Sequence, residues 1–292
     1  MFFILLSMIL LGVTSPLFCA TFRDALDREI TLDRPPERIV SLAPSLTEVL
    51  FFLGLGDRVA GVTRFSSYPP EAARKPKVGS YINLNIEKII SLNPDLVIGT
   101  VDGNASSTVG MLEEAGLRVF IVDPRNVGQV IETVHKLGRI CGVNEKAETL
   151  SRMLQTRVDH ILEKTGMREK PLVFLQINLR PIITVNRHTY HHDLIRLAGG
   201  VNMTRNEFLN YPRIGLEEVI RRKPEVILIS SMERGGTFEK ARTEWMKWTS
   251  IPAVRQNRVH LIDSDLIDRP SPRIVTGLED MARLIHPEAG WD

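Results

Sequence analysis

Cysteine is scarce in this chain, with only two among 292 residues. So few cysteines exclude a disulfide-rich scaffold, and the fold must rest on hydrophobic cores. Cys19 lies in an apolar N-terminal stretch, and cleavage beyond it would leave Cys141 as the remaining thiol. We expect Cys141 to be buried in a core.

An excess of charge of either sign is also missing. Lys and Arg number 37 and Asp and Glu number 35, which gives a net charge of +2. That balance gives no support to nucleic acid or an anionic membrane surface as a partner. The apolar content of 43% and the charged content of 25% are typical of a soluble globular protein, and the length predicts two domains.

Catalytic and cofactor motifs are missing as well, because the sequence has no Walker loop and no GxGxxG, GxSxG, HExxH or CxxC motif. Two groups of metal-ligand residue types occur, His188-x-x-His191-His192 and Asp263-x-Asp265. Histidines at a helix start and aspartates in a loop are common surface chemistry, so we predict neither a metal site nor a catalytic site. A two-lobed α/β enzyme or metal-cluster scaffold is the alternative, and it would require a catalytic pair between the lobes.

No charged residue occurs in the first 22 positions. About a dozen apolar residues are followed there by Thr14-Ser15-Pro16, which is the shape of a secretory signal rather than a membrane span. We therefore predict a signal peptide at 1–20 and a periplasmic location. Lipidation of Cys19 is an alternative, although a bulky residue precedes it.

The stretch at 144–166, NEKAETLSRMLQTRVDHILEKTG, has the apolar spacing of a helix. Asn144 is expected to cap its start and Gly166 to end it. A helix of this length spans about 33 Å, the width of a small domain, so we expect a rigid strut. Its apolar face consists of Ala147, Leu150, Met153, Leu154, Val158, Ile161 and Leu162.

The sequence repeats itself on the two sides of this helix. Residues 85–100 (NIEKIISLNPDLVIGT) and 215–230 (GLEEVIRRKPEVILIS) align without a gap. Each contains an amphipathic turn, a proline followed by an acidic residue, and then an apolar run. Glu87 is thereby paired with Glu217. The chain therefore contains two copies of a helix-Pro-strand unit, one in each half.

Strands alternate with helices in both halves, which predicts an α/β fold with mostly parallel sheets flanked by helices. We expect one lobe at 21–143, the bridging helix at 144–166 and a second lobe at 167–292. Because the connection between the lobes is a helix, large hinge motion is not expected.

Local details follow from the same rules. Ser45 and Glu48 have the spacing of a capping box, so a helix should begin at Ser45. Short strands are expected at 77–79 and 182–185, and an edge hairpin at 22–32.

In open parallel sheets, ligands bind beyond the carboxyl ends of the strands. All four tyrosines fall in or beside such loops, together with Phe65. A tyrosine there offers a flat apolar face and one hydrogen bond, which suits a large, partly polar ligand held between two lobes. The tyrosines are Tyr68, Tyr81, Tyr190 and Tyr211.

Arginines occupy the same loops, and the helix start at Ser45 presents backbone N–H groups, so acidic or carboxamide-rich ligands are favoured. We expect two or three of the arginines at most to reach a ligand. The candidates are Arg64, Arg180, Arg187, Arg205, Arg213 and Arg269.

Glu87 and Glu217 fall in the first turns of their helices, where the helix dipole stabilises a carboxylate. The dipole explains either residue singly but not their matching position in both halves. We predict that the two carboxylates, if exposed, form a two-point docking site for a partner with matching arginines.

Several segments resemble the helical-backbone substrate-binding proteins of ABC importers, and the resemblance covers nearly the whole chain after the signal. The family fold is two α/β lobes bridged by one rigid long helix, with the ligand in the cleft, which agrees with the predicted strut and repeat. The segments are SLAPSLTE at 41–48, YPPEA at 68–72, NPDLVIG at 93–99, LAGGVN at 197–202 and SDLIDRPSPRI at 264–274.

The resemblance implies roles for particular residues and partners. Glu87 and Glu217 match the lobe-tip carboxylates that dock arginine pockets on a permease dimer, which works with cytoplasmic ATPase subunits. The implied ligand contacts are Phe65, Tyr68, Tyr81, Tyr211, Asp265 and Arg269.

Within the family the chain is most similar to the members that bind cobalamin, so a corrinoid is the expected ligand. Tyr81 and Tyr211 stand where those members have tryptophans, and tyrosines also stack on a flat macrocycle. A ferric siderophore or haem is the alternative, favoured by the loop arginines and by Tyr190 with His188. Ser45 and Tyr190 complete the ligand-binding candidates, and we expect a monomer without a cofactor of its own.

Overall fold

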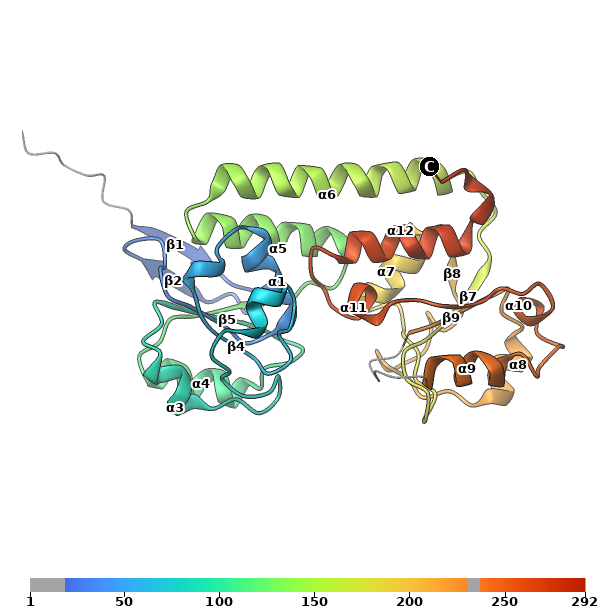
Figure 1. Cartoon of the computed structure of the whole chain (residues 1–292), viewed down its shortest axis with the longest axis horizontal. Helices are drawn as coiled ribbons and strands as arrows, with labels where there is room; N and C mark the ends of the chain where they lie inside the picture. The colour runs from blue at the N-terminus through green and yellow to red at the C-terminus, as the bar shows by residue number, and fades with distance from the viewer. Residues whose placement is uncertain (1–18, 231–236, 292) are drawn as a thin grey trace, which may run out of the picture.

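One long helix, α6 (Asn144–Thr165), runs along two α/β lobes. The computed structural model describes residues 19–230 and 237–291. Figure 1 shows α5 (Val127–Ile140) and α12 (Ile274–Ile285) lying end to end beneath α6, one above each lobe. The expected strut is therefore present, and it packs on a second helical layer rather than standing free.

The first lobe contains a parallel four-stranded sheet in the order β4-β3-β5-β6. Its strands are β3 (Ile39–Ser41), β4 (Val59–Val62), β5 (Leu96–Thr100) and β6 (Val119–Val122). The antiparallel hairpin of β1 (Ala20–Arg23) and β2 (Glu29–Leu32) precedes it, as expected for 22–32. The helical segments are α1 (Pro44–Phe52), η1 (Gly56–Arg58), α2 (Pro70–Ala73), α3 (Ile86–Ser91), α4 (Ser106–Glu114) and α5.

The second lobe contains a parallel sheet in the order β10-β9-β7-β8. Its strands are β7 (Leu172–Gln176), β8 (Val201–Asn202), β9 (Val226–Ile229) and β10 (Val259–Leu261). Its described helical segments are α7 (Tyr190–Leu197), α8 (Leu216–Arg222), α9 (Thr237–Trp245), α10 (Pro252–Arg255), α11 (Ser264–Ile267), α12 and η2 (Pro287–Ala289).

The two sheets have the same topology. Numbered along the chain within each lobe, the strands of both sheets lie in the order second, first, third, fourth. The repeated segments supply the third strand in each case, β5 after α3 and β9 after α8. The internal repeat predicted from the sequence therefore corresponds to a repeated structural unit.

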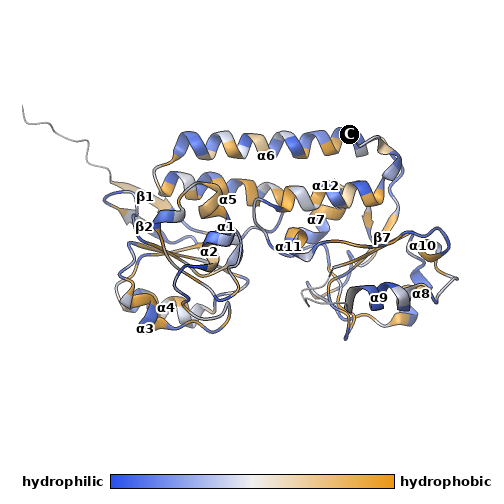
Figure 2. Cartoon of the chain, viewed as in Figure 1, coloured by the Kyte–Doolittle hydropathy of each residue, from blue (hydrophilic) through white to orange (hydrophobic). Residues whose placement is uncertain are grey.

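One of three hydrophobic clusters among the described residues runs through both lobes. It joins the inner face of α6 to α5 and to α12, with Leu154, Leu137 and Leu278 all almost fully buried. Met153 and Leu162, which were expected on the apolar face of α6, are instead 44% and 38% exposed. In Figure 2 the strands are mainly apolar while hydrophilic residues recur along α6, as expected for a helix buried on one face.

Two predicted helix caps are wrong. Helix α6 begins at Asn144 itself, so Val143 is the N-cap residue and makes no side-chain capping bond. Helix α1 begins at Pro44, which is favoured in a first turn, so Ala43 rather than Ser45 is its N-cap. Glu48 therefore makes no capping box and is free to reach a distant partner.

The predicted strands at 77–79 and 182–185 form only isolated bridges, because neither segment meets a neighbour over consecutive residues. The two-residue strand β8 was missed. Cys141 is fully buried as expected, and burial raises the pKa of its thiol to about 12.

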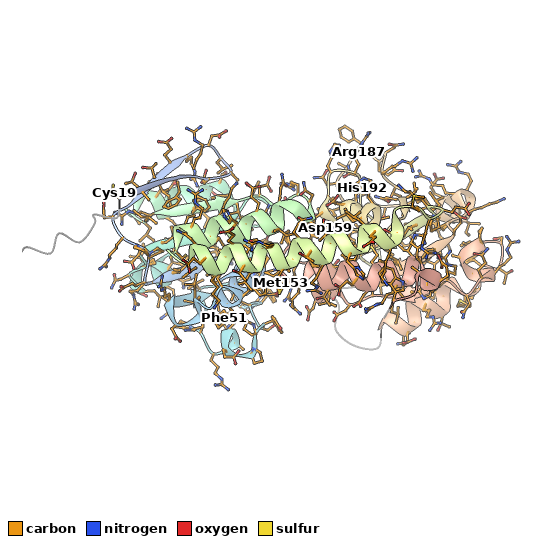
Figure 3. All side chains as sticks on the ribbon, turned by 90° about the horizontal axis from the view of Figure 1, so that it is seen from above. Cys19, Phe51, Met153, Asp159, Arg187 and His192 are labelled. Atoms are coloured by element: carbon orange, nitrogen blue, oxygen red, sulfur yellow. The ribbon has the colours of Figure 1, made fainter. Side chains whose placement is uncertain are left out.

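Most of the predicted signal peptide, residues 1–18, lies outside the described residues. Cys19 is exposed at the outer end of the first lobe (Figure 3). Among the described helices, none combines the length and the apolar character that crossing a membrane requires.

Candidate functional site

Two loops and the start of α7 bring four aromatic side chains together. Tyr81 comes from the first lobe, whereas Tyr190, His191 and Tyr211 come from the second. Besides burial, Tyr211 contributes to the raised pKa of Tyr81, and Tyr81 contributes to that of Tyr190, so the tyrosines of the two lobes lie near one another. We call these four residues the interlobe aromatic cluster.

The rings of this cluster are held in defined positions. Tyr190 is stacked on His191 with 4.2 Å between ring centroids, and its hydroxyl donates to the Asp268 carbonyl over 2.9 Å. His191 meets Tyr211 edge to face at 6.2 Å. The Tyr81 ring lies so close to Gly103 that a Cβ there would come within 1.6 Å of it.

The tyrosine hydroxyls remain protonated at neutral pH. Burial raises the pKa of Tyr211 to about 12 and raises those of Tyr81 and Tyr190 further. For Tyr81 and Tyr211, the negative charge of Asp102 is the second largest cause of the raised pKa. The cluster therefore offers neutral phenols with apolar faces.

A short charged network lies beside the tyrosines. Arg125 reaches Asp102 at 2.8 Å and Asp123 at 2.7 Å. These residues were missed in the sequence, although they follow β5 and β6 and the strand-end rule that selected the tyrosines also covers them. The guanidinium of Arg125 is thus already occupied by two carboxylates.

An ion-pair group also joins the lobes. Glu48 of α1 accepts from Arg273 at 2.7 and 2.8 Å and from Arg269 at 3.3 Å. The Glu48 side chain is only 2% exposed, and both arginines belong to the second lobe. We call Glu48, Arg269 and Arg273 the interlobe clamp.

Several predicted ligand contacts surround the clamp instead of the aromatic cluster. Arg273 lies over the ring of Tyr68 at 3.9 Å, and Asp265 pairs with Arg269 at 3.1 Å. Ser45 is buried in the first turn of α1. The predicted contacts therefore fall into two groups, one with the aromatic cluster and one with the clamp.

Phe65 is stacked by its neighbour Arg64 at 4.8 Å and is about half exposed. Other arginines proposed from the loops have protein partners. Arg180 pairs with Glu244 at 2.7 Å, and Arg205 donates to the Asn202 carbonyl at 3.3 Å. These contacts reduce the positive charge available to a ligand.

The three histidines of the sequence cluster have separate surroundings. His188 is exposed, His191 is paired with Asp268, and the His192 ring lies 3.4 Å from Asn202. Figure 3 places His192 and Arg187 along one edge of the second lobe. In the part of the chain that the structure describes, no three His, Cys, Asp or Glu residues are grouped to hold a metal.

Glu87 and Glu217 are both exposed and both lie in the first turn of a short helix, α3 and α8. Figure 1 shows these helices at the lobe edges opposite α6. Asn85 caps α3 by accepting from the Lys88 N–H at 2.8 Å. Each carboxylate is therefore presented on an ordered helix start.

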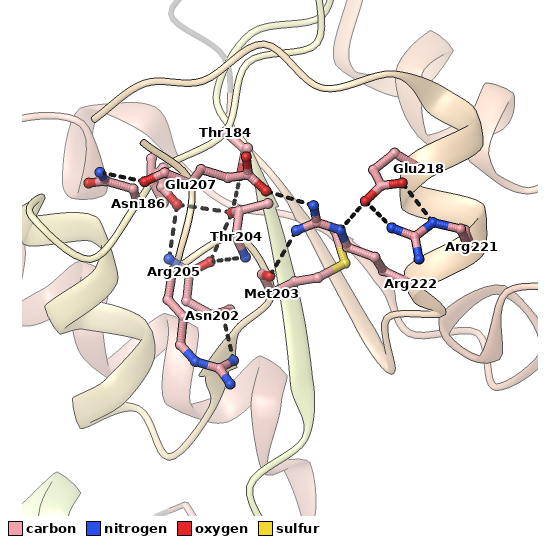
Figure 4. A network of polar contacts seen from close by, with 11 residues as sticks. Thr184, Asn186, Asn202, Met203, Thr204, Arg205, Glu207, Glu218, Arg221 and Arg222 are labelled. Atoms are coloured by element: carbon pink, nitrogen blue, oxygen red, sulfur yellow. Dashed lines mark hydrogen bonds and ion pairs between the residues drawn. The ribbon is translucent and has the colours of Figure 1, made fainter. Parts of the chain in front are cut away.

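A polar network joins the end of α8 to the segment after β8, in the connection that also carries Tyr211 (Figure 4). Arg222 of α8 donates to Glu207 at 2.6 Å and also contacts Glu218. The Glu207 carbonyl accepts from Asn186 at 3.1 Å. Helix α8 and the segment after β8 are thus held together by side-chain hydrogen bonds and ion pairs.

A cavity of about 510 Å³ lies elsewhere, beside α9. Arg180, Lys240, Trp245 and Trp248 are among its lining residues, which all belong to the second lobe. Because the first lobe contributes nothing to it, this cavity is separate from the interlobe aromatic cluster.

Comparison with known proteins decides what kind of site this is. A family model described as periplasmic binding protein matches residues 39–266. This chain belongs to the periplasmic binding protein family. The family consists of solute binders, so this periplasmic binding protein takes a small-molecule ligand, acts outside the cytoplasm and works with an ABC transporter.

Individual relatives support the assignment of the chain to this family. This periplasmic binding protein is 31% identical over 93% of its length to an uncharacterized ABC transporter substrate-binding lipoprotein, YvrC of Bacillus subtilis, covering 87% of that protein. It is 31% identical to the vitamin B12-binding protein of Vibrio parahaemolyticus, with 84% and 88% of the two chains covered.

Solved structures agree on the two-lobed architecture. The crystal structure of the periplasmic vitamin B12-binding protein BtuF of Vibrio cholerae matches with a TM-score of 0.79 and 27% identity, covering 88% of this chain and 99% of that one. The periplasmic heme-binding protein RhuT of Roseiflexus sp. RS-1 matches with a TM-score of 0.75 and 25% identity, covering 87% and 99%.

Proposed function

We propose that this protein captures a corrinoid of the cobalamin type between its lobes and delivers it to an ABC importer. The observation that carries the proposal is the interlobe aromatic cluster with its neutral phenols. Aromatic faces suit the apolar surface of a flat macrocycle, and hydroxyl groups suit its carboxamide side chains. Similarity to vitamin B12-binding proteins supports the same ligand.

The charges around the cluster also favour a neutral ligand. Together with burial, Asp102 and Asp268 raise the pKa of Tyr211, and the guanidinium of Arg125, which lowers it, is shared between Asp102 and Asp123. The carboxylates of Asp102, Asp123 and Asp268 outnumber this guanidinium, so a ligand carrying several negative charges would be repelled. A corrinoid amide surface avoids that repulsion.

The second candidate is haem or a ferric siderophore, favoured by the fold likeness to a heme-binding protein. The contacts of the loop arginines weigh against it, because Arg125, Arg180 and Arg269 already bind carboxylates. The Tyr190 hydroxyl also donates a hydrogen bond to the Asp268 carbonyl.

Docking to the importer is the second step of the proposed function. We assign Glu87 and Glu217 to arginine pockets on the two subunits of a permease dimer that is driven by cytoplasmic ATPase subunits. Their exposure and their positions on matching helices support this assignment. We also propose that the mature chain acts as a periplasmic monomer after removal of residues 1–20, with a lipid on Cys19 as the alternative.

The ligand is tested by isothermal calorimetry of the mature chain with cyanocobalamin, hemin and a ferric catecholate. We expect one-to-one binding of cyanocobalamin and no heat with the two iron compounds. Binding of hemin or the catecholate without cyanocobalamin would replace the corrinoid by the second candidate.

Substitutions in the interlobe aromatic cluster test whether cyanocobalamin binds there. Tyr81→Ala and Tyr211→Ala should each weaken cyanocobalamin binding about tenfold or more, roughly 1.4 kcal/mol, because each removes a buried aromatic contact. Met167→Ala is the matched control, since Met167 is 98% exposed at the end of α6. Equal affinities of all three variants would place the ligand elsewhere.

A further inference from the structure

His191 is a buried residue in which only one of the two imidazole nitrogens has a hydrogen-bond partner. Its side chain is 3% exposed, and Nε2 lies 3.0 Å from Asp268 Oδ1. Its Nδ1 has no hydrogen-bond partner although it is buried. Buried polar atoms without partners are uncommon and costly, so this atom needs an explanation.

Asp268 determines what Nδ1 can do. The Asp268 carboxylate can only accept, and it accepts from His191 through Oδ1 and from the Ser230 hydroxyl through Oδ2 at 2.8 Å. Nε2 therefore carries the proton. In the neutral imidazole, Nδ1 is then a lone pair that can accept a hydrogen bond but cannot donate one.

The position of the ring relates this lone pair to the proposed ligand. His191 is stacked on Tyr190 and meets the edge of Tyr211, so it belongs to the interlobe aromatic cluster. Tyr211 itself is 39% exposed, so the cluster is reached from solvent past this side chain. A ligand that moves the Tyr211 ring aside would bring its polar groups to the buried His191 ring and its fixed acceptor.

We propose that His191 Nδ1 accepts a hydrogen bond from an N–H group of the ligand, with Asp268 as the residue that positions it. A primary carboxamide is the group that fits, and corrinoids carry several. Haem, whose peripheral polar groups are carboxylates, has only acceptors to offer at neutral pH. The inference rests on the proposed function and adds a specificity contact to it.

Two variants test the inference with cyanocobalamin as the probe. Asp268→Asn keeps the size of the side chain, and its amide can donate to Nε2, which moves the imidazole proton to Nδ1 and turns the acceptor into a donor. His191→Phe keeps a flat ring and removes the acceptor. Each should weaken binding in calorimetry at mildly alkaline pH by about tenfold, whereas His188→Gln, at an exposed position, should not.

A direct measurement covers the case in which a variant folds poorly. In the wild-type protein, the ¹⁵N resonance of His191 Nδ1 should have the shift of an unprotonated nitrogen and should move when cyanocobalamin is added. Melting curves establish whether each variant is folded. An unmoved resonance, or folded Asp268→Asn and His191→Phe proteins with wild-type affinity, would overturn the inference.

The outcomes also separate this inference from the proposed function. Failure of the wild-type protein to bind cyanocobalamin overturns the corrinoid proposal and the His191 contact with it. Wild-type binding together with unchanged variants and an unmoved resonance overturns the His191 contact alone.

Discussion

Tyr81 and Tyr211 couple the stability of the protein to alkaline pH. Because burial raises their pKa values, to about 12 for Tyr211, the folded state holds these protons more tightly than the unfolded state does. The resulting stability is complete below the ordinary tyrosine pKa of about 10 and is lost as pH rises from there toward the folded-state values. We expect the free energy of unfolding in urea to fall between about pH 10 and pH 12.

The variant pair Tyr81→Phe and Tyr211→Phe isolates this effect, because phenylalanine keeps the ring and removes the titrating hydroxyl. The doubly substituted protein should lose stability less steeply with pH than the wild type does. If the free energy of unfolding of both proteins fell equally with pH, the two phenols would have the same pKa in the folded and the unfolded state.

Sequence rules predicted that tyrosines of both lobes lie on one side of the sheets, but they did not predict the role of Glu48. The tyrosines follow from a local rule, since loops after parallel strands face the ligand side. Glu48 has a local explanation too, a capping box, and that explanation is wrong because Pro44 starts the helix one residue earlier. Its true partners, Arg269 and Arg273, lie more than 200 positions away, and no spacing pattern reports such a contact.

Among the elements, the starts of α3 and α8 carry the docking hypothesis. Reversing the charge at both positions, with Glu87→Arg and Glu217→Arg, should sharply reduce uptake of cobalamin in cells that depend on this protein. Its affinity for cobalamin should stay unchanged, because both side chains are exposed at the lobe edges opposite α6.

The control for that experiment makes the same charge change on another helix. Glu145→Arg and Glu163→Arg are exposed positions on α6, on the opposite side of the molecule from α3 and α8. This control should transport normally. If the Glu87 and Glu217 variant took up cobalamin normally, the role of both residues would be limited to stabilising their helices through the helix dipole.

The elements also show which parts of the fold can be predicted from a repeating pattern in the sequence. The long helix and the repeated unit were predictable because each is written over sixteen or more consecutive residues. Strand β8 has two residues, too few for any pattern. The predicted segment at 182–185 has strand-like residues, yet only Ile183 finds bridging partners, because its neighbours run irregularly.

At the level of the whole molecule, the interlobe clamp contributes to stability. Glu48→Gln removes the carboxylate that Arg273 and Arg269 share and leaves Arg269 with Asp265 alone among the described residues, and breaking a buried ion pair costs about 3 kcal/mol. We expect a loss of this size in the free energy of urea unfolding. Hydrogen exchange should also become faster at the start of α12 and in α1, where the lobes meet.

Glu114→Gln serves as the reference for this substitution, since Glu114 is exposed at the end of α4. It should unfold like the wild type. Wild-type stability of the Glu48→Gln protein would mean that water replaces the lost interactions.

The lobes are joined by more than the clamp. Asp193 of α7 accepts from the Val127 N–H at the start of α5 over 2.9 Å, and Arg157 of α6 holds Glu279 of α12 at 2.8 Å. Together with the continuous core, these contacts leave little room for a wide hinge motion. Selection of the ligand would then depend on walls that are already formed.

The end of the chain is tied to α6. The Trp291 indole donates to the His286 carbonyl over 2.7 Å, and Lys164 lies 5.5 Å from its ring. Figure 1 shows this end on the side of the molecule away from α3 and α8. A protein immobilised on a sensor chip through its C-terminus would therefore present both lobe tips to the solution, so permease in detergent micelles could be passed over a uniformly oriented surface.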